Sequence, residues 1–239
     1  MLAAVDFNNP IIWAILIGWI MSVVLHEWAH GFVAYLGGDY TIKERGGLSL
    51  NPLQYVDPIF SLLLPAVFLM MGGVPLPGGV TYIRHDLLRS KGWRSAVAAA
   101  GPLMNFMLFL LLALPFHPRV GWIDPTASVE RYETWHIFLG AMVLLQGIAV
   151  AINLIPVPPL DGFNIIAPYM KEEARIKLTT PPISTYSMLA LFLILWNVPA
   201  VFEKIVWLIV RLLVRLGYDY DAIAMMLKSY NLAFFGRDI

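Results

Sequence analysis

The chain has 239 residues, of which 59% are hydrophobic and only 13% charged, and its formal net charge is zero. A typical soluble domain carries about 25% charged residues, so this composition predicts an integral membrane protein in a lipid bilayer. The neutral balance argues against a nucleic acid partner. The chain has no cysteine, which excludes disulfides, thiolate metal ligands and a cysteine nucleophile.

The first long apolar run, Pro10 to Leu36, has the length and composition of a membrane-spanning helix. Its only charged or imidazole side chains are His26, Glu27 and His30. Positions i and i+4 share one face of a helix, so both imidazoles point the same way, with the carboxylate beside them. Such a group suits a zinc ion whose bound water the carboxylate deprotonates. The alternative is polar packing within a helical bundle, but a bound metal better offsets the free energy of placing these groups in a bilayer.

Residues 37–94 follow as a polar, glycine-rich region that contains one short apolar segment. Asp39 to Ile42 and Gly47 to Leu50 predict a small β-hairpin at the membrane surface. The segment Ile59 to Met71 would reach about 20 Å as a helix, which is short of a bilayer core of about 30 Å. A re-entrant path for it gives nine basic residues on one side of the membrane against two on the other, and the basic side is then cytoplasmic. The nine are Lys43, Arg45, Arg84, Arg89, Lys91, Arg94, Lys171, Arg175 and Lys177, and the two are Arg119 and Arg131.

The remaining segments complete an all-α polytopic membrane protein. We expect one domain, 1–239, with about five to six transmembrane helices, a re-entrant segment and the surface β-hairpin. Its parts are a metal-motif helix (10–36), surface strands and the re-entrant segment (37–94), a second-motif helix (95–116), a helix over Trp135 to Leu154 followed by the Asp-Gly motif (together 135–165), C-terminal helices (183–216) and an interfacial tail (217–239). Whether 183–216 forms one kinked span or a hairpin stays open, although charge favours the hairpin because Arg211 and Arg215 then join the basic side.

A catalytic zinc needs a third protein ligand and one position left open for water. The candidates are His85, His117, His136 and Asp161. The predicted topology places His117 and His136 at the opposite face, and His85 lies in a basic surface segment. Asp161 follows a span, on the correct side and among apolar residues, so we favour it over the alternative of an ordinary Asp-Gly turn.

Three elements of the sequence together resemble the signature motifs of the site-2 protease family of intramembrane zinc metalloproteases. They are His26-Glu27-Trp28-Ala29-His30, then Gly101-Pro102-x-x-Asn105, then Asn153-x-x-Pro156-x-Pro158-x-x-Asp161-Gly162. The resemblance covers about residues 18–165 in family order. The stretches 47–52 and 74–77 are similar to the compact branch of the family, which lacks PDZ and CBS domains.

The resemblance implies one zinc ion per chain on His26, His30 and Asp161, with Glu27 as the catalytic base. It also implies that Asn153 positions the substrate or the developing oxyanion, and that Gly101 with its neighbouring proline allows close helix packing. Asn105 matches the second motif without an assigned role. The implied substrate is a single-span transmembrane protein cut in or near its membrane segment. We expect a bacterial-type plasma membrane and an active site nearer the cytoplasmic face; the oligomeric state stays open.

Two other classes of protein are alternatives to a protease. A metal-ion transporter would need polar residues along several spans, and this chain offers mainly Asn105, Gln146 and Asn153. A non-catalytic adaptor with a structural zinc would use four ligands and would not need Glu27. For a protease, the glycine-rich stretch Gly78 to Tyr82 offers an edge on which an extended substrate could pair; the alternative is a surface hairpin that covers the bundle.

Overall fold

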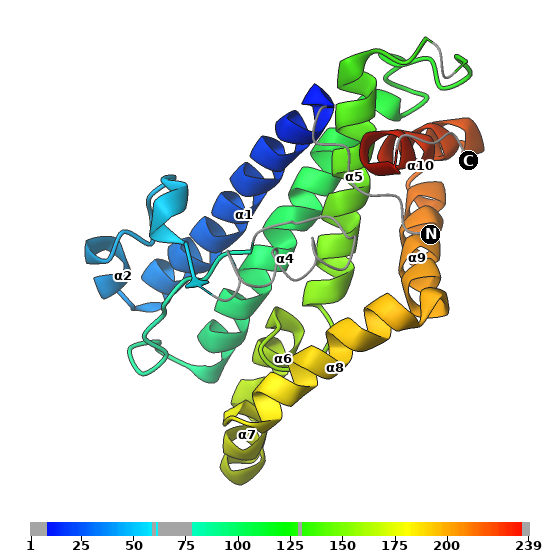
Figure 1. The fold of residues 1–239 in the computed structure, drawn as a ribbon. Coiled ribbons are helices and arrows are strands. Elements are labelled where there is room, and N and C mark those ends of the chain that lie inside the picture. The colour runs from blue at the N-terminus through cyan, green and yellow to red at the C-terminus, as the bar shows by residue number, and fades with distance from the viewer. Residues whose placement is uncertain (1–8, 59–60, 62–77, 129–130, 236–239) are drawn as a thin grey trace.

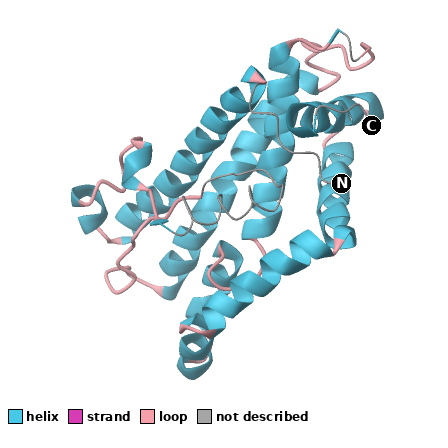
Figure 2. Cartoon of the chain, in the orientation of Figure 1, coloured by secondary structure: helices cyan, strands magenta, loops and turns pink. Residues whose placement is uncertain are grey.

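The computed structural model describes residues 9–58, 61, 78–128 and 131–235, and throughout these ranges the chain forms helices and turns without a β-strand (Figures 1 and 2). Three helices are long and apolar enough to cross a membrane: α1 (Pro10–Gly37), α4 (Lys91–Ala113, continued by a 3₁₀ turn over Leu114–Phe116) and α5 (Thr134–Asn153). The chain is therefore an all-helical membrane protein, as its composition predicts.

Capping residues explain where the first two spans begin and end. The Asn9 side chain accepts a hydrogen bond from the backbone N–H of Ile11 at the start of α1, and the Ser90 hydroxyl accepts one from Trp93 at the start of α4. Helix α1 ends at Gly37, and the φ of +120° at the following Gly38 suits glycine and allows the chain to turn away sharply. The end of α1 and the start of α4 lie at the same end of the molecule (Figure 1).

The end of α1 and the start of α4 are in direct contact. The backbone N–H of Arg89 donates to the Gly37 carbonyl at 3.1 Å, and the Arg89 guanidinium donates to the Leu36 carbonyl at 2.6 Å. The chain between these helices thus leaves and returns at one end, which is the arrangement that a re-entrant segment requires. The segment 59–71 itself lies almost wholly outside the described residues.

The prediction of a β-hairpin over 39–42 and 47–50 is wrong. These residues instead form a short helix, α2 (Thr41–Glu44), followed by turns and a 3₁₀ turn (Pro52–Gln54). The reason is local hydrogen bonding: the Asp39 carboxylate accepts bonds from Thr41 and Arg45, which closes a helical turn, and Gly46 adopts a φ of +80°.

Beyond α5 the chain forms a series of shorter helices. They are α6 (Asp161–Ile166), a 3₁₀ turn (Ala167–Tyr169), α7 (Glu172–Thr179), α8 (Ile183–Asn197), α9 (Pro199–Arg215) and α10 (Tyr220–Phe235). Helix α9 begins at Pro199, and residues Leu189–Leu195 of α8 lie at 80° to it. The chain after α9 lies against His117, whose ring nitrogen is 3.3 Å from the Leu216 carbonyl.

This arrangement corrects two expectations. Helices α8 and α9 together lead from the end that carries α6 and α7 to the opposite end (Figure 1), so they do not form the hairpin that charge favoured. The count of five to six spans is also too high for the described residues, which hold three candidate spans, or four if the bent pair is counted. At 15 and 17 residues, α8 and α9 are each shorter than the roughly 20 residues that a straight span needs.

Helix α4 lies between α1 and α5, and α10 crosses α5 near its start (Figure 1). The main core gathers large buried side chains from α4, α5, α9 and α10, among them Phe109, Leu144, Ile209 and Met226. A Cβ at Gly140 would lie 2.6 Å from the Ser229 Cβ, so glycine is what lets α10 approach α5. This core is at the end of the bundle away from the His-Glu-x-x-His motif.

Candidate metal centre

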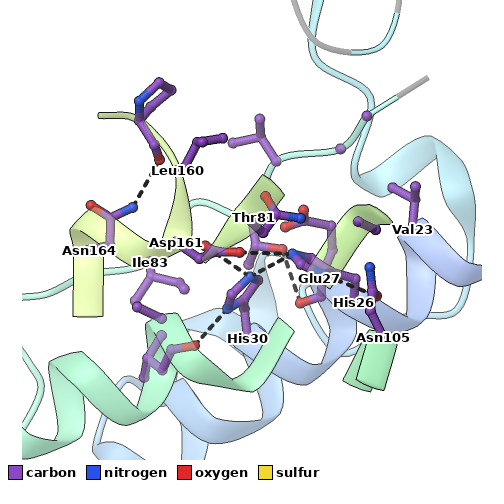
Figure 3. A pocket seen from close by; sticks show the side chains of 18 of the residues that line it. Val23, His26, Glu27, His30, Thr81, Ile83, Asn105, Leu160, Asp161 and Asn164 are labelled. Carbon is purple, nitrogen blue, oxygen red and sulfur yellow. Dashed lines mark hydrogen bonds and ion pairs between the residues drawn. The ribbon is translucent and has the colours of Figure 1, made fainter. Parts of the chain in front are cut away.

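His26 and His30 lie one turn apart on α1 and face Asp161, the first residue of α6 (Figure 3). The two Nε2 atoms are 3.1 Å apart. The Asp161 carboxylate places Oδ2 at 3.2 Å from Nε2 of His26 and Oδ1 at 3.5 Å from Nε2 of His30. The structure thus brings together the three residues that were predicted as metal ligands.

The Nδ1 atoms of the two imidazoles face hydrogen-bond acceptors. Nδ1 of His26 donates to the Asn105 side-chain oxygen at 3.2 Å, and Nδ1 of His30 donates to the Val97 carbonyl at 2.6 Å. Since a neutral imidazole carries one proton, each Nε2 is left with a lone pair. Two lone pairs and a carboxylate therefore converge on one point, which is the electrostatic arrangement that a cation stabilises.

The distances between these donors fit a tetrahedral ion. Nitrogen and oxygen ligands bind zinc at about 2.0–2.1 Å, so any two ligands of a tetrahedral site lie about 3.3 Å apart. The separations of 3.1, 3.2 and 3.5 Å between the three side chains are close to this value, with each imidazole nearest to a different oxygen of the Asp161 carboxylate. The fourth position remains for water or substrate, as in catalytic rather than structural zinc sites.

Gly101 on α4 makes this arrangement sterically possible. A Cβ at this position would lie 2.3 Å from Nε2 of His30 and 2.4 Å from Nε2 of His26. Any side chain here would occupy the space in which the donors converge. The predicted role of Gly101 in close helix packing thus has a specific purpose, because α4 passes directly beside the two imidazoles.

Asp161 is held in place by the connection between α5 and α6. The neighbouring Gly162 packs so closely on the end of α5 that a Cβ would lie 2.2 Å from the Leu154 carbonyl oxygen. The Asn164 amide donates to the Pro159 carbonyl at 3.1 Å, and the Ser95 hydroxyl of α4 donates to the Ile165 carbonyl at 2.6 Å. The Asp-Gly pair therefore starts a helix against α4 and α5, and the alternative of an ordinary surface turn does not describe it.

Comparison with curated proteins finds relatives over most of the chain. A protein of Mycolicibacterium smegmatis that is named as a zinc metalloprotease, Rip2, is 36% identical over 220 residues, which are 90% of this chain and 76% of the relative. Rip2 of Mycobacterium tuberculosis is 32% identical over 81% of this chain and 72% of its own. YwhC of Bacillus subtilis, also named as a zinc metalloprotease, is 30% identical over 75% of this chain and 78% of its own.

The chain belongs to the site-2 protease family of zinc metalloproteases. No family model matches it, and no solved structure matches it. The two imidazoles on α1 and the Asp161 carboxylate on α6 are accordingly the candidate zinc site of a site-2 protease. Among the described residues, one cluster of side chains could hold a metal ion by the proximity of its ligand atoms, and it consists of His26, Glu27 and His30.

Glu27 lies on the wall of a cavity of about 350 Å³ in this site-2 protease. Glu27 is 7% exposed, and the segment that contains Gly79 packs on its side chain, since a Cβ at Gly79 would lie 3.0 Å from the Glu27 Cγ. Asn153, the last residue of α5, lines the same cavity together with Asp161. Glu27, the predicted base, and Asn153, the predicted oxyanion donor, therefore line the same cavity as the predicted metal ligands (Figure 3 shows this region).

Two of the other candidate ligands of the site-2 protease lie away from the donor set. His117 packs edge-on against Tyr218 at the opposite end of the bundle, and His136 takes part in the N-terminal cap of α5. The third candidate, His85, lines the same cavity as the donor set. Although its side chain is exposed, the pKa of its imidazole is lowered, first by desolvation and then by the nearby guanidinium groups of Arg94 and Arg175.

Sequence reasoning missed two groups that orient the imidazoles. Asn105 carried a motif match but no role, and the structure places its side-chain oxygen on Nδ1 of His26, with 5% of the residue exposed. A buried asparagine one helical turn after Gly101 was the available signal. The Val97 carbonyl left no signal, because contact with a backbone acceptor on α4 depends on how the chain is packed rather than on which residue is present. His30 can approach α4 this closely because Gly101 contributes no side chain.

Proposed function

We propose that this protein is an intramembrane endopeptidase that hydrolyses a peptide bond in or near the transmembrane segment of a single-span membrane protein. The observation that carries the proposal is the three-donor face of His26, His30 and Asp161, which sits beside Glu27 at the inner part of a cavity in a bundle of apolar helices. A structural zinc site would be closed by a fourth ligand and would not need a cavity.

The residues divide the chemistry between them. Zinc, when bound by His26, His30 and Asp161, lowers the pKa of water and polarises a carbonyl group. Glu27 takes the proton of the attacking water and then delivers it to the leaving amine. The Asn153 side-chain amide donates a hydrogen bond to the oxyanion that forms on the substrate carbonyl, a role that is often worth about 3 kcal/mol.

A helical substrate must unwind before its carbonyl can be attacked, and the segment from Gly78 to Arg84 offers it a partner. The backbone groups of even-numbered residues in this segment bond to the protein: Val80 N–H donates to the Tyr55 carbonyl at 3.0 Å, Tyr82 C=O accepts from Arg45 at 2.8 Å, and Arg84 N–H donates to Asp39 at 2.8 Å. Such alternation is typical of an extended strand with one edge engaged.

Within the part of the chain that the structure describes, nothing pairs with the opposite edge of this segment. The backbone N–H and C=O groups of Gly79, Thr81 and Ile83 have no hydrogen-bond partner among the described residues, and all three residues line the cavity. An unwound substrate strand can pair with this edge by β-augmentation, which would lay its backbone alongside Glu27 and the three metal ligands.

The test compares wild type with Glu27→Gln, a change that keeps the size of the side chain and removes the base. Both purified proteins would be assayed for bound zinc and for cleavage of a single-span test protein in detergent. The proposal expects zinc in both and cleavage by wild type alone. Cleavage by Glu27→Gln at the wild-type rate would refute it, as would a zinc-loaded wild type that cleaves none of a panel of single-span proteins. A transporter or adaptor would keep its function in the mutant.

A further inference from the structure

Asp39 is fully buried, with 0% of its surface exposed, although it lies just beyond the end of α1 in a loop. An unpaired buried carboxylate would be strongly destabilising, so its partners show what it is for. They come from two parts of the chain that are far apart in sequence. Neither part carries a metal ligand.

Two of the partners lie on α2 and just after it. The Thr41 hydroxyl donates to Oδ1 of Asp39 at 2.5 Å, and the Arg45 guanidinium donates to Oδ2 at 3.1 Å. The same Arg45 nitrogen also donates to the Thr41 hydroxyl at 2.7 Å. We name Asp39, Thr41 and Arg45 the Asp39 clamp.

The Asp39 clamp also binds the segment that covers the active site. Oδ2 of Asp39 accepts the backbone N–H of Arg84 at 2.8 Å, and the other guanidinium nitrogen of Arg45 donates to the Tyr82 carbonyl at 2.8 Å. These two bonds engage successive even-numbered residues on one edge. They leave the intervening Ile83 with its backbone groups directed the other way, toward the cavity that it lines.

The same segment is fixed to the catalytic helix one residue earlier. The Thr81 hydroxyl donates to the backbone carbonyl of Glu27 at 3.2 Å, and Gly79 packs on the Glu27 side chain. A sliding of the segment by one residue would exchange its open and engaged edges, because the backbone groups alternate in direction. The clamp bonds at Tyr82 and Arg84 are specific to one of these registers.

We propose that Asp39 is a positioning residue, which with Arg45 locks the register of residues 79–84 so that the backbone edge of Gly79, Thr81 and Ile83 faces the substrate. This inference rests on the proposed function, since it assigns the clamp to substrate binding. It assigns no role to the clamp in zinc binding or in proton transfer. Loss of the clamp therefore weakens substrate binding more than it slows the chemical step.

The experiment uses full-length protein with zinc bound and two variants, Asp39→Asn and Arg45→Gln. Arg45 is partly exposed, so its variant keeps the test valid if the buried Asp39→Asn fails to fold. Lys43→Gln is the matched control, because it removes a positive charge from the same short helix at an exposed position with no hydrogen bond to the segment. Each protein is measured for zinc content, thermal stability, hydrogen exchange of the Arg84 amide, and the KM and kcat of cleavage.

The clamp predicts that both variants retain zinc, that the Arg84 amide exchanges about tenfold faster or more, and that KM rises about tenfold while kcat changes little. Lys43→Gln should match wild type in all four measurements. Unchanged exchange at Arg84, or lower thermal stability with an unchanged KM, would overturn the inference. A wild type that holds zinc and cleaves nothing would overturn the proposed function instead, and the exchange data would then decide the clamp alone.

Discussion

The space between the metal donors exists because residue 101 is a glycine. Its missing side chain leaves the volume in which Nε2 of His26, Nε2 of His30 and the Asp161 carboxylate converge. The sequence predicted the three donors because their residue types carry the chemistry. The sequence could predict close helix packing at Gly101, but it could not predict that Gly101 packs against the two imidazoles, since that depends on where α4 crosses α1.

Replacing Gly101 with alanine should abolish zinc binding. The added methyl group would lie within 2.4 Å of both Nε2 atoms, so α4 must move away and the donors separate. Overpacking of this kind typically costs about 1–3 kcal/mol of stability. Metal analysis of the purified variant checks the outcome.

Gly92→Ala is the control for that substitution, because it lies on the same helix and its Cβ would meet only the Ser90 hydroxyl, at 3.6 Å. It should bind zinc as wild type does and be slightly more stable through helix propensity. Full zinc occupancy in Gly101→Ala would contradict the geometry of the site.

Asn105 is expected to act on the metal through His26 rather than by direct contact. Asn105→Ala removes the acceptor for the Nδ1 proton of His26, and losing such a partner lowers metal affinity about 10–100-fold. Competition with a zinc chelator measures this. Asn197→Ala, which removes only a bond to the Leu193 carbonyl in α8, serves as the control and should retain wild-type affinity. Equal affinities in the two variants would rule out the role of Asn105.

His85 should titrate below the ordinary imidazole pKa of 6.5, and Arg175→Gln should raise its pKa. In wild type, desolvation and the positive charges of Arg94 and Arg175 disfavour the protonated ring and lower the pKa of His85. The variant removes one of those charges and also frees Glu172, whose carboxylate is paired with Arg175. Both changes favour the imidazolium form. NMR titration of the His85 ring protons tests the direction, and a fall in pKa would contradict it.

At the scale of elements, hydropathy predicted the three long helices within a few residues, because a membrane span leaves a strong and continuous signal. The hairpin over 39–50 failed for a different reason. Short alternating stretches are weak evidence for strands, and here a buried side chain, Asp39, determines the turn instead. Such a tertiary contact is not visible in local pattern.

The open edge of residues 79–83 gives a matched pair of proline substitutions. Ile83→Pro removes an N–H group from the edge that faces the cavity, whereas Tyr82→Pro removes one from the opposite edge. Cleavage by Ile83→Pro should show a raised KM, and Tyr82→Pro should retain most of its activity. Michaelis–Menten analysis with a single-span substrate distinguishes them. Equal losses in both variants would show that the substrate does not pair with this edge.

For the whole molecule, the structure places basic residues at both ends of the bundle. Charge counting favoured a C-terminal hairpin because it placed Arg211 and Arg215 with the other cations. The chain instead brings α9 to the end that carries His117. The rule failed here because the packing of α9 on α5, around buried Ile209 and Leu213, fixes its direction more strongly than two exposed arginines do.

Because the chain has no cysteine, single introduced cysteines can test this topology cleanly. Lys91→Cys and Lys177→Cys should react with a membrane-impermeant maleimide from one side of the membrane. Arg119→Cys and Arg215→Cys should react from the other side, since α9 ends beside His117. Labelling of intact and inverted vesicles makes the comparison. Reaction of Arg215→Cys from the same side as Lys177→Cys would contradict this topology and support a hairpin of α8 and α9.

The central claim is that two imidazoles of α1 and the carboxylate of α6 form three corners of a zinc tetrahedron. Zinc K-edge X-ray absorption of the purified protein, in wild type and in Asp161→Ala, tests it most directly. The structure predicts about one zinc per chain in wild type, with two imidazole nitrogens and further oxygen donors at about 2.0–2.1 Å, and weakened or absent binding in the variant. A wild-type protein without zinc, or one whose zinc environment is unchanged in Asp161→Ala, would contradict the account.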